Sequence, residues 1–169
     1  HAATQSVSQT IHWLADDRLT RYSLGQPLQF ADPVTSYWRG ADDYVRAQGN
    51  DAVYTLESRV SLALPEQLQT ALLDDVPFVV LNRYTNINTN VPARVTQLAA
   101  EITAGATSDY ERARMIEAFL HQYPYTLAID AAPTDRDLVD YFLFDLQKGY
   151  CDYYASAMTI LARAVGRPA

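Results

Sequence analysis

Hydrophobic and polar positions alternate in the first half of the chain and recur with helical spacing in the second half. The clearest alternation covers residues 51–64 and predicts a half-buried β-strand that ends at Pro65. Residues 34–38 and 43–47 also have a strand-like composition, and residues 65–73 predict a short helix. We therefore predict a β-rich N-terminal region over residues 1–80, with the change of pattern lying within residues 76–90.

The remaining residues, 81–169, predict a helical region and give the chain an α+β fold class. A first helix over residues 91–105 has Asn90 as its cap and Pro92 in its first turn, where proline needs no N–H partner. A second helix over residues 108–122 begins with the capping-box pair Ser108 and Glu111.

Two more helices follow, and the second begins at the only cysteine of the chain. Thr134 and Asp137 form a weaker capping signature for a helix that continues to Leu146. From Cys151 onward, apolar residues recur at helical spacing. A thiol at the first position faces the unpaired N–H groups and positive dipole end of its helix, which favour the thiolate over the thiol.

Composition narrows the classes of protein to which this chain can belong. The chain has 169 residues, of which 49% are hydrophobic and 20% charged, so it is long enough for a core and is not disordered. Its net charge of −7 and its lack of basic clusters argue against nucleic acid as a partner. No apolar run is long enough to span a bilayer, no signal peptide is expected at the N-terminus, and no spacing of metal ligands or cofactor motif is recognised.

The segment that begins at Gly149 resembles a known nucleophile motif. The residues that carry the resemblance are Gly149-Tyr150-Cys151-Asp152-Tyr153-Tyr154-Ala155-Ser156-Ala157, then Leu161-Ala162-Arg163, then Gly166-Arg167-Pro168-Ala169. They are similar to the motif of bacterial transglutaminase-like proteins, which belong to the papain-like thiol enzymes. The resemblance extends back to about Tyr84 and includes the Tyr123-Pro124-Tyr125-Thr126 turn and the Asp140-Tyr141-Phe142-Leu143-Phe144 run.

The resemblance implies which residues form the site. Cys151 is the expected nucleophile, and Gly149, Tyr150 and Asp152 are candidates for the cleft or the oxyanion site. Gly149 would suit a backbone with positive φ, a close approach of substrate, or the C-cap of the preceding helix. Asp152 suits the positive helix end, yet its charge opposes thiolate formation.

The same resemblance implies that a β-sheet, with a histidine and an acidic residue, follows the cysteine helix. The chain stops at Ala169, just after that helix. Because a thiol needs a base and an orienting group, we expect this chain alone to be inactive and the catalytic sheet to be missing from it. His1, His12 and His121 all lie upstream and match no catalytic position of the family.

Two functions remain open at this point. The first is a transglutaminase-like cysteine enzyme that transfers or hydrolyses amide groups of peptides or proteins through a thioester, in an extracytoplasmic domain of a membrane protein. The second is a non-catalytic module of the same fold that binds a peptide or an envelope partner. Because transglutamination and proteolysis share the thioester, the sequence does not separate them. A third reading, self-association through exposed helix faces, concerns the isolated chain alone.

Overall fold

The computed structural model describes residues 4–14, 20–39, 43–87 and 90–169. It divides into two compact units, His1–Leu64 and Pro65–Ala169. The described strands all lie in the first unit and the helices in the second, so the α+β class is confirmed. The division falls at Pro65 rather than near residue 80, because the chain after Pro65 forms α1 (Pro65–Gln69), η1 (Leu73–Asp75) and α2 (Phe78–Tyr84).

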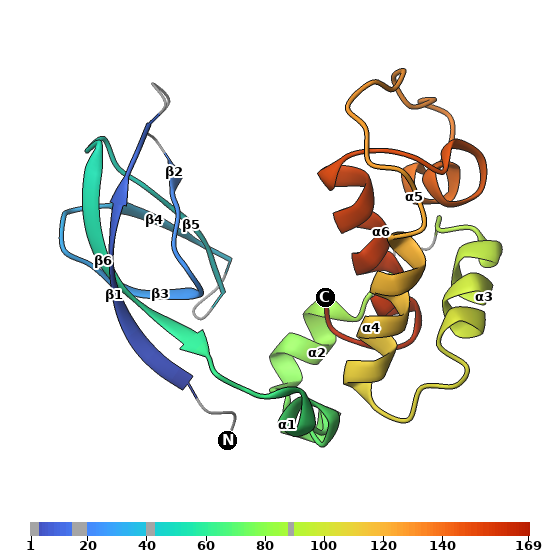
Figure 1. Ribbon diagram of the computed structural model, residues 1–169, viewed down its shortest axis with the longest axis horizontal. Coiled ribbons are helices and arrows are strands. Elements are labelled where there is room, and N and C mark those ends of the chain that lie inside the picture. The colour runs from blue at the N-terminus through green and yellow to red at the C-terminus, as the bar shows by residue number, and fades with distance from the viewer. Residues whose placement is uncertain (1–3, 15–19, 40–42, 88–89) are drawn as a thin grey trace. The chain divides into compact units, whose positions relative to one another are not determined.

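The first unit contains two three-stranded antiparallel sheets (Figure 1). One has the order β1-β6-β3, formed by Thr4–His12, Val53–Ser61 and Gln26–Phe30; the other has the order β2-β5-β4, formed by Thr20–Arg21, Tyr44–Gln48 and Thr35–Trp38. The predicted strands correspond to β6, β4 and β5. The sequence did not predict β1, because its only large apolar residues are Val7 and Ile11.

Tyr54 on β6 connects the two sheets of the first unit. Its hydroxyl accepts a hydrogen bond from the Tyr22 backbone N–H at 2.7 Å and lies 3.0 Å from the Tyr22 carbonyl. The buried guanidinium of Arg21, on β2, lies 4.3 Å from the centre of the Tyr54 ring and donates to the Asp51 carbonyl at 2.6 Å. An aromatic ring and a charge-assisted hydrogen bond thus stabilise a buried cation in this small core.

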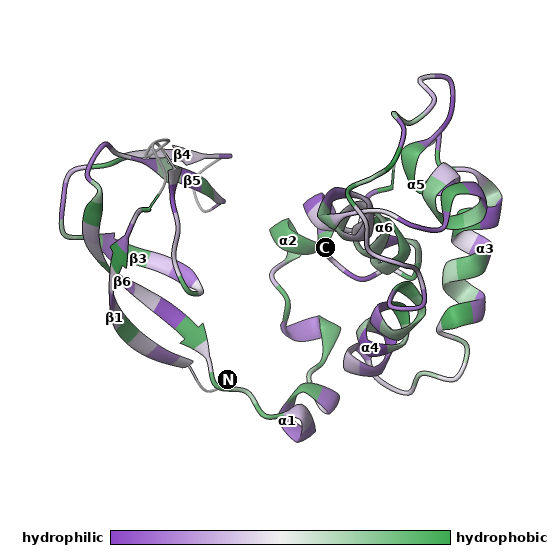
Figure 2. Ribbon diagram, turned by 45° about the horizontal axis from the view of Figure 1, so that its top comes forward, coloured by the Kyte–Doolittle hydropathy of each residue, from purple (hydrophilic) through white to green (hydrophobic). Residues whose placement is uncertain are grey.

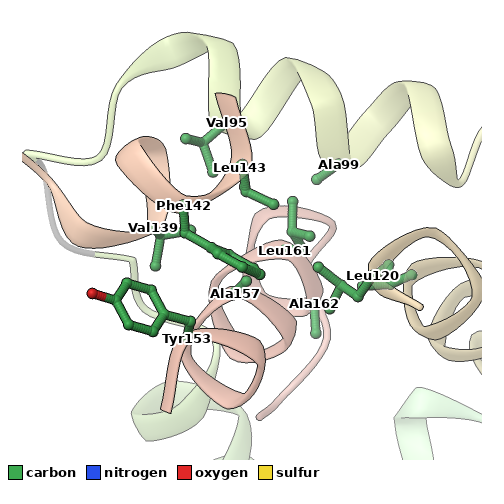
Figure 3. Packing of buried hydrophobic residues seen from close by; sticks show 11 residues of the cluster. Val95, Ala99, Leu120, Val139, Phe142, Leu143, Tyr153, Ala157, Leu161 and Ala162 are labelled. Atoms are coloured by element: carbon green, nitrogen blue, oxygen red, sulfur yellow. The ribbon is translucent and has the colours of Figure 1, made fainter. Parts of the chain in front are cut away.

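The second unit is built around α6 (Cys151–Ala164), which contacts α3 (Ala93–Ile102), α4 (Asp109–Leu120), α5 (Leu138–Tyr141) and the single-turn π-helix η2 (Phe142–Leu146). Its core consists of buried side chains from all of these elements: Val95, Ala99, Ile116, Leu120, Val139, Phe142, Leu143, Tyr153, Ala157, Leu161 and Ala162. Phe142 points toward Ala157, with Tyr153 beside it (Figure 3). The small side chains of Ala157 and Ala162 let neighbouring elements approach α6 closely.

The helix starts differ in part from those predicted. α6 begins at Cys151 as expected, and Ser108 caps α4 by accepting from the Glu111 N–H at 3.1 Å. The cap of α5, however, is Asp137 itself, which accepts from the Asp140 N–H at 2.8 Å, so the predicted Thr134 cap is wrong. α3 is capped by Pro92 rather than Asn90, because the backbone at Pro92 is still extended.

Two arginines hold the buried carboxylate of Asp140 between α3 and α5. Arg94 on α3 donates to its two oxygens at 2.5 and 2.6 Å, and Arg136 donates to it at 3.2 Å. Asp145 joins the cluster through Arg136 at 2.6 Å. The hydrogen bond from Arg94 is the main reason why the pKa of Asp140 is lowered, against the opposing effect of burial. Since Asp140 is only 5% exposed, the cluster ties α3 to the segment that carries Phe142.

No helix in the described part of the chain is long and apolar enough to cross a membrane. Some apolar side chains of the helical unit nevertheless face solvent: α2 is coloured hydrophobic along much of its length in Figure 2, and Phe78 and Val79 on it are exposed.

Replacement of Asp140 by Asn should destabilise the helical unit by about 2 kcal/mol, because two arginines lose a charged acceptor at a buried position. Urea unfolding followed by far-ultraviolet circular dichroism measures this change. Asp145→Asn is the matched control, since its side chain is 43% exposed and Asp140 still pairs with both arginines; it should have a smaller effect. Tryptophan fluorescence, which reports only the strand unit because Trp13 and Trp38 lie there, should change in neither variant.

The same carboxylate predicts a pH dependence. Since the pKa of folded Asp140 is lowered, its contribution is fully present above the unfolded value of about 3.9 and is lost as pH falls through the folded pKa. The stability difference between the wild type and Asp140→Asn should therefore be constant near pH 6 and shrink below about pH 4. An unchanged difference at acidic pH would mean that Asp140 does not contribute as a carboxylate.

Candidate functional site

The thiol of Cys151 is exposed at the first residue of α6. Tyr150, the N-cap, has an extended backbone with φ −125° and ψ −174°, and its carbonyl accepts from the Tyr153 N–H at 3.0 Å. Cys151, Asp152 and Ala155 share the exposed side of the helix, whereas Tyr153 and Ala157 face the core. The free donors of a helix start, together with its dipole, therefore lie at an accessible thiol.

The strand-like contact between Tyr125 and Gly149 fixes the approach of the chain to Cys151. The two residues form an isolated parallel bridge. The Thr126 N–H donates to the Gly149 carbonyl at 2.7 Å, and the Gly149 N–H donates to the Pro124 carbonyl at 3.2 Å. A turn more than twenty residues upstream thus provides the hydrogen-bond partners of both backbone groups of Gly149. Gly149 itself lies two residues before Cys151.

Two of the purposes expected of Gly149, a positive φ and the C-cap of the preceding helix, are wrong. Its φ is not positive, since the described residues with positive φ are Gln147, Gly25 and Gly166. Gln147, with φ 49°, is the left-handed C-cap of η2, so Gly149 is not the cap either. A Cβ at Gly149 would lie 3.2 Å from three side-chain atoms of Tyr153. Glycine therefore fits this position because the Tyr153 side chain packs closely against it.

Most of the tyrosines near the site pack rather than line a cleft. Phe142 is in ring contact with Tyr123, Tyr153 and Tyr154 at centroid distances of 5.2–5.6 Å. The Tyr154 hydroxyl donates to the Tyr123 carbonyl at 2.7 Å. Desolvation is the main cause of the raised pKa of Tyr123, Tyr153 and Tyr154, so these hydroxyls stay neutral.

Tyr125 and Tyr150 lie nearer the solvent. Tyr150 is half-buried, with its ring edge-to-face against Tyr153 at 5.2 Å. Tyr125 is 64% exposed and stacks on Tyr154 at 6.1 Å. Since Tyr154 lies one helical turn after Cys151, the Tyr125 ring covers the same end of α6 as the thiol.

Asp152 is the polar neighbour of the thiol. The Cys151 Sγ donates a weak hydrogen bond to Asp152 Oδ1 at 3.5 Å. A carboxylate accepts a hydrogen bond from an S–H group, and its negative charge repels negative charge at the sulfur. The helix start and Asp152 thus act on the thiol in opposite directions.

The structure brings no described histidine into a hydrogen bond or ion pair with Cys151. His121 is the C-cap of α4 and His12 lies on β1, both exposed. His1 lies outside the described residues. Neither do the described residues include a cluster of His, Cys, Asp or Glu that could hold a metal ion.

A separate pocket of about 340 Å³ lies in the same unit, between η1, α4, α6 and the C-terminal residues. Its walls are mostly apolar and include Ile116, Met158 and Ala162. The polar residues at its edge are already paired, since Arg112 and Arg167 both bind Asp109, at 2.7 and 2.9 Å. Cys151 does not line this pocket, so we do not assign it to the thiol site.

The sequence identified the thiol but not the turn that positions it. In the sequence, the Tyr123-Pro124-Tyr125-Thr126 turn contributes only to the family resemblance. The bridge to Gly149 joins backbone atoms, so no side-chain pattern marks it. The glycine itself was the available signal, because a residue without Cβ also permits the close approach of a neighbouring side chain.

Comparisons with known proteins find relatives of the helical unit. Residues 96–169 match the family model described as the Transglutaminase-like superfamily. The uncharacterized protein YebA of Bacillus subtilis is 33% identical over 91 residues, which are 52% of this chain and 12% of YebA. A protein-glutamine gamma-glutamyltransferase of Pseudomonas aeruginosa is 40% identical over 57 residues, 34% of this chain and 8% of that protein. The matched part is thus a small fraction of either relative.

A solved structure extends the likeness to both units. The periplasmic domain of TgpA from Pseudomonas aeruginosa superposes with a TM-score of 0.62 at 19% identity, covering 99% of this chain and 55% of that domain. At this identity the match shows the fold alone. Residues 96–169, which include α4, η2 and α6, are thus similar to the transglutaminase-like superfamily, and the solved structure shares the fold of this chain.

Proposed function

We propose that Cys151 is the nucleophile of a thiol-dependent enzyme that acts on amide groups of peptides or proteins. The observation that carries this proposal is an exposed thiol at the first residue of a helix whose other side is buried in the core. Burial of α6 and the Gly149 bridge hold the thiol on rigid elements, as nucleophilic catalysis requires.

The reaction would proceed through a thioester. The Cys151 thiolate attacks the amide carbonyl, and the carbonyl oxygen becomes an oxyanion that the Cys151 backbone N–H can bind. The C–N bond then breaks, and the leaving amine or ammonia takes a proton from a general acid. Attack by an amine completes acyl transfer, whereas attack by water completes hydrolysis; both release the thiolate.

A histidine and an acidic residue would supply the proton transfers. No described residue fills these roles beside Cys151, and the family resemblance places both in a sheet that follows the cysteine helix. We infer that the complete protein provides them, and that residues 1–169 alone do not turn over substrate. The relative named a protein-glutamine gamma-glutamyltransferase supports glutamine side-chain amides as the acyl donor.

We also propose that the site works outside the cytoplasm. The solved domain with the same fold is a periplasmic domain. Attachment of the parent protein to a membrane remains part of this proposal.

The test of the proposal uses a chain extended past Ala169 through the residues that follow it in the parent protein. Incubated with a glutamine-rich protein and a primary amine, it should release ammonia and incorporate the amine. Cys151→Ser should lower the rate by about 10³-fold or more with unchanged circular dichroism. Equal rates in the extended wild type and its Cys151→Ser variant would show that Cys151 is not the nucleophile. Binding of the substrate without turnover in either chain would favour the non-catalytic module.

Replacement of Asp152 by Asn should increase the rate of Cys151 alkylation by iodoacetamide at neutral pH by about threefold to tenfold. The substitution removes a negative charge and an S–H acceptor 3.5 Å from the sulfur, and that charge repels the thiolate, which is the form that reacts. The measurement is the pseudo-first-order rate of labelling, read by mass spectrometry.

Asp74→Asn is the control for this comparison, because it makes the same change of charge at an exposed position on η1. It should leave the rate unchanged. A slower reaction of Asp152→Asn would show that Asp152 activates the thiol rather than opposing it.

A further inference from the structure

The strand unit contains a pocket of about 220 Å³ beside the edge strands β3 and β4 and the loop that joins them. Three aromatic side chains line it, each from a different strand: Phe30 on β3, Trp38 on β4 and Tyr44 on β5. Sites for drug-sized ligands enclose about 300–1,000 Å³. This smaller pocket therefore suits a single short side chain or a molecule of similar size.

The aromatic rings of the pocket are set at steep angles to one another. The planes of Trp38 and Tyr44 meet at 79°, with 5.4 Å between the ring centres. Trp38 is 54% exposed, and Phe30 and Tyr44 are half-buried. The face of an aromatic π system is negative, and rings grouped around a small space are the arrangement by which proteins bind alkylammonium ions.

The charge of the pocket also favours a cation. Asp32 is the one charged residue of its lining. The Asp32 side chain is exposed and forms no salt bridge or hydrogen bond with the residues that the structure describes. The other two described aspartates of the strand unit are paired, Asp43 with Arg39 and Asp51 with Arg21, both at 3.2 Å. A carboxylate that lacks a counter-ion attracts a cation from outside.

The neighbouring ring of Tyr37 shows how this unit already binds a cation of its own. The guanidinium of Arg46 lies 4.6 Å from the centre of the Tyr37 ring. Tyr37 does not line the pocket, whereas the next residue, Trp38, does. No arginine, lysine or histidine belongs to the lining, so the described residues provide no internal cation for the pocket.

We propose that this pocket binds an alkylammonium ion, with the alkyl chain against Phe30, Trp38 and Tyr44 and with Asp32 as the counter-ion. A lysine side chain of a polypeptide and a free primary amine both have this chemistry. The inference is independent of the proposed function, because all of these residues lie in the strand unit and Cys151 takes no part.

The test is a titration of the 169-residue chain with butylammonium chloride at constant ionic strength, followed by ¹H–¹⁵N correlation spectra. The indole N–H resonance of Trp38 should shift and saturate. That of Trp13 should not, because its ring stacks on Tyr22 and does not line the pocket. 1-Butanol has the same chain without the charge and should bind about tenfold more weakly. Equal affinity for the two probes, or no saturable shift at Trp38, would overturn the proposal.

Two variants test the residues. Asp32→Asn should weaken butylammonium binding by about threefold to tenfold, because the counter-charge is lost. Glu57→Gln is the matched control, since Glu57 is exposed on the adjacent strand β6 and does not line the pocket; it should leave the affinity unchanged. Trp38→Leu should weaken binding by about tenfold, read at the Ser36 amide. An unchanged affinity in Asp32→Asn, whose exposed position does not affect folding, would overturn the proposal even if Trp38→Leu fails to fold.

A second titration separates the two sources of the cation. Nα-acetyl-lysine methylamide carries the ammonium group on a peptide backbone, and Nα-acetyl-norleucine methylamide is its uncharged counterpart. Binding of the lysine compound as tight as that of butylammonium would favour a polypeptide side chain, whereas binding of butylammonium alone would favour a free amine. If the norleucine compound binds as tightly as the lysine compound, the pocket does not select a cation and the proposal is wrong.

Discussion

The packing of Phe142 against α6 is the contact on which the helical unit depends. The ring is fully buried and touches Tyr123, Tyr153 and Tyr154, which come from the turn after α4 and from the first turns of α6. Aromatic pairs of this kind add about 0.5–1.5 kcal/mol each beyond the burial of their area. Because two of the four rings belong to α6, the same contact that forms the core also sets the position of the helix start.

The residues around this ring explain how the thiol can be exposed and still be well placed. Tyr154 donates to the Tyr123 carbonyl, and Gly149 pairs with the turn that follows Tyr123. The chain is therefore held on both sides of Cys151, once before it through backbone atoms and once after it through a side chain. Of the four residues between Gly149 and Tyr154, Cys151 and Asp152 are exposed to solvent. This division between a fixed frame and a short exposed segment is what a nucleophile requires.

The ion cluster of Asp140 extends the same frame outward. Arg94 comes from α3, whereas Asp140 and Arg136 lie at the start of the segment that continues into Phe142. A carboxylate buried to this degree is tolerated because two guanidinium groups donate hydrogen bonds to it. The cluster thus sets the direction of α5 and η2, and through them the position of Phe142. In the strand unit, the buried Arg21 is held in a comparable way by the Tyr54 ring and the Asp51 carboxylate. There, however, the acidic partner Asp51 is largely exposed.

The sequence by itself determined the features that depend on near neighbours. The alternation before Pro65 predicted β6, the Ser108 and Glu111 pair predicted the start of α4, and Cys151 was placed at a helix start, because each involves residues within a few positions of one another. Tertiary structure decided the rest. β1 is a strand because β6 provides its hydrogen-bond partners, despite its polar sequence. Asp137 rather than Thr134 caps α5, since residues 134–136 form a turn before the helix begins. The bridge between Tyr125 and Gly149 joins backbone atoms that are distant in sequence, and backbone groups are the same for every residue, so no pattern of side chains could reveal it.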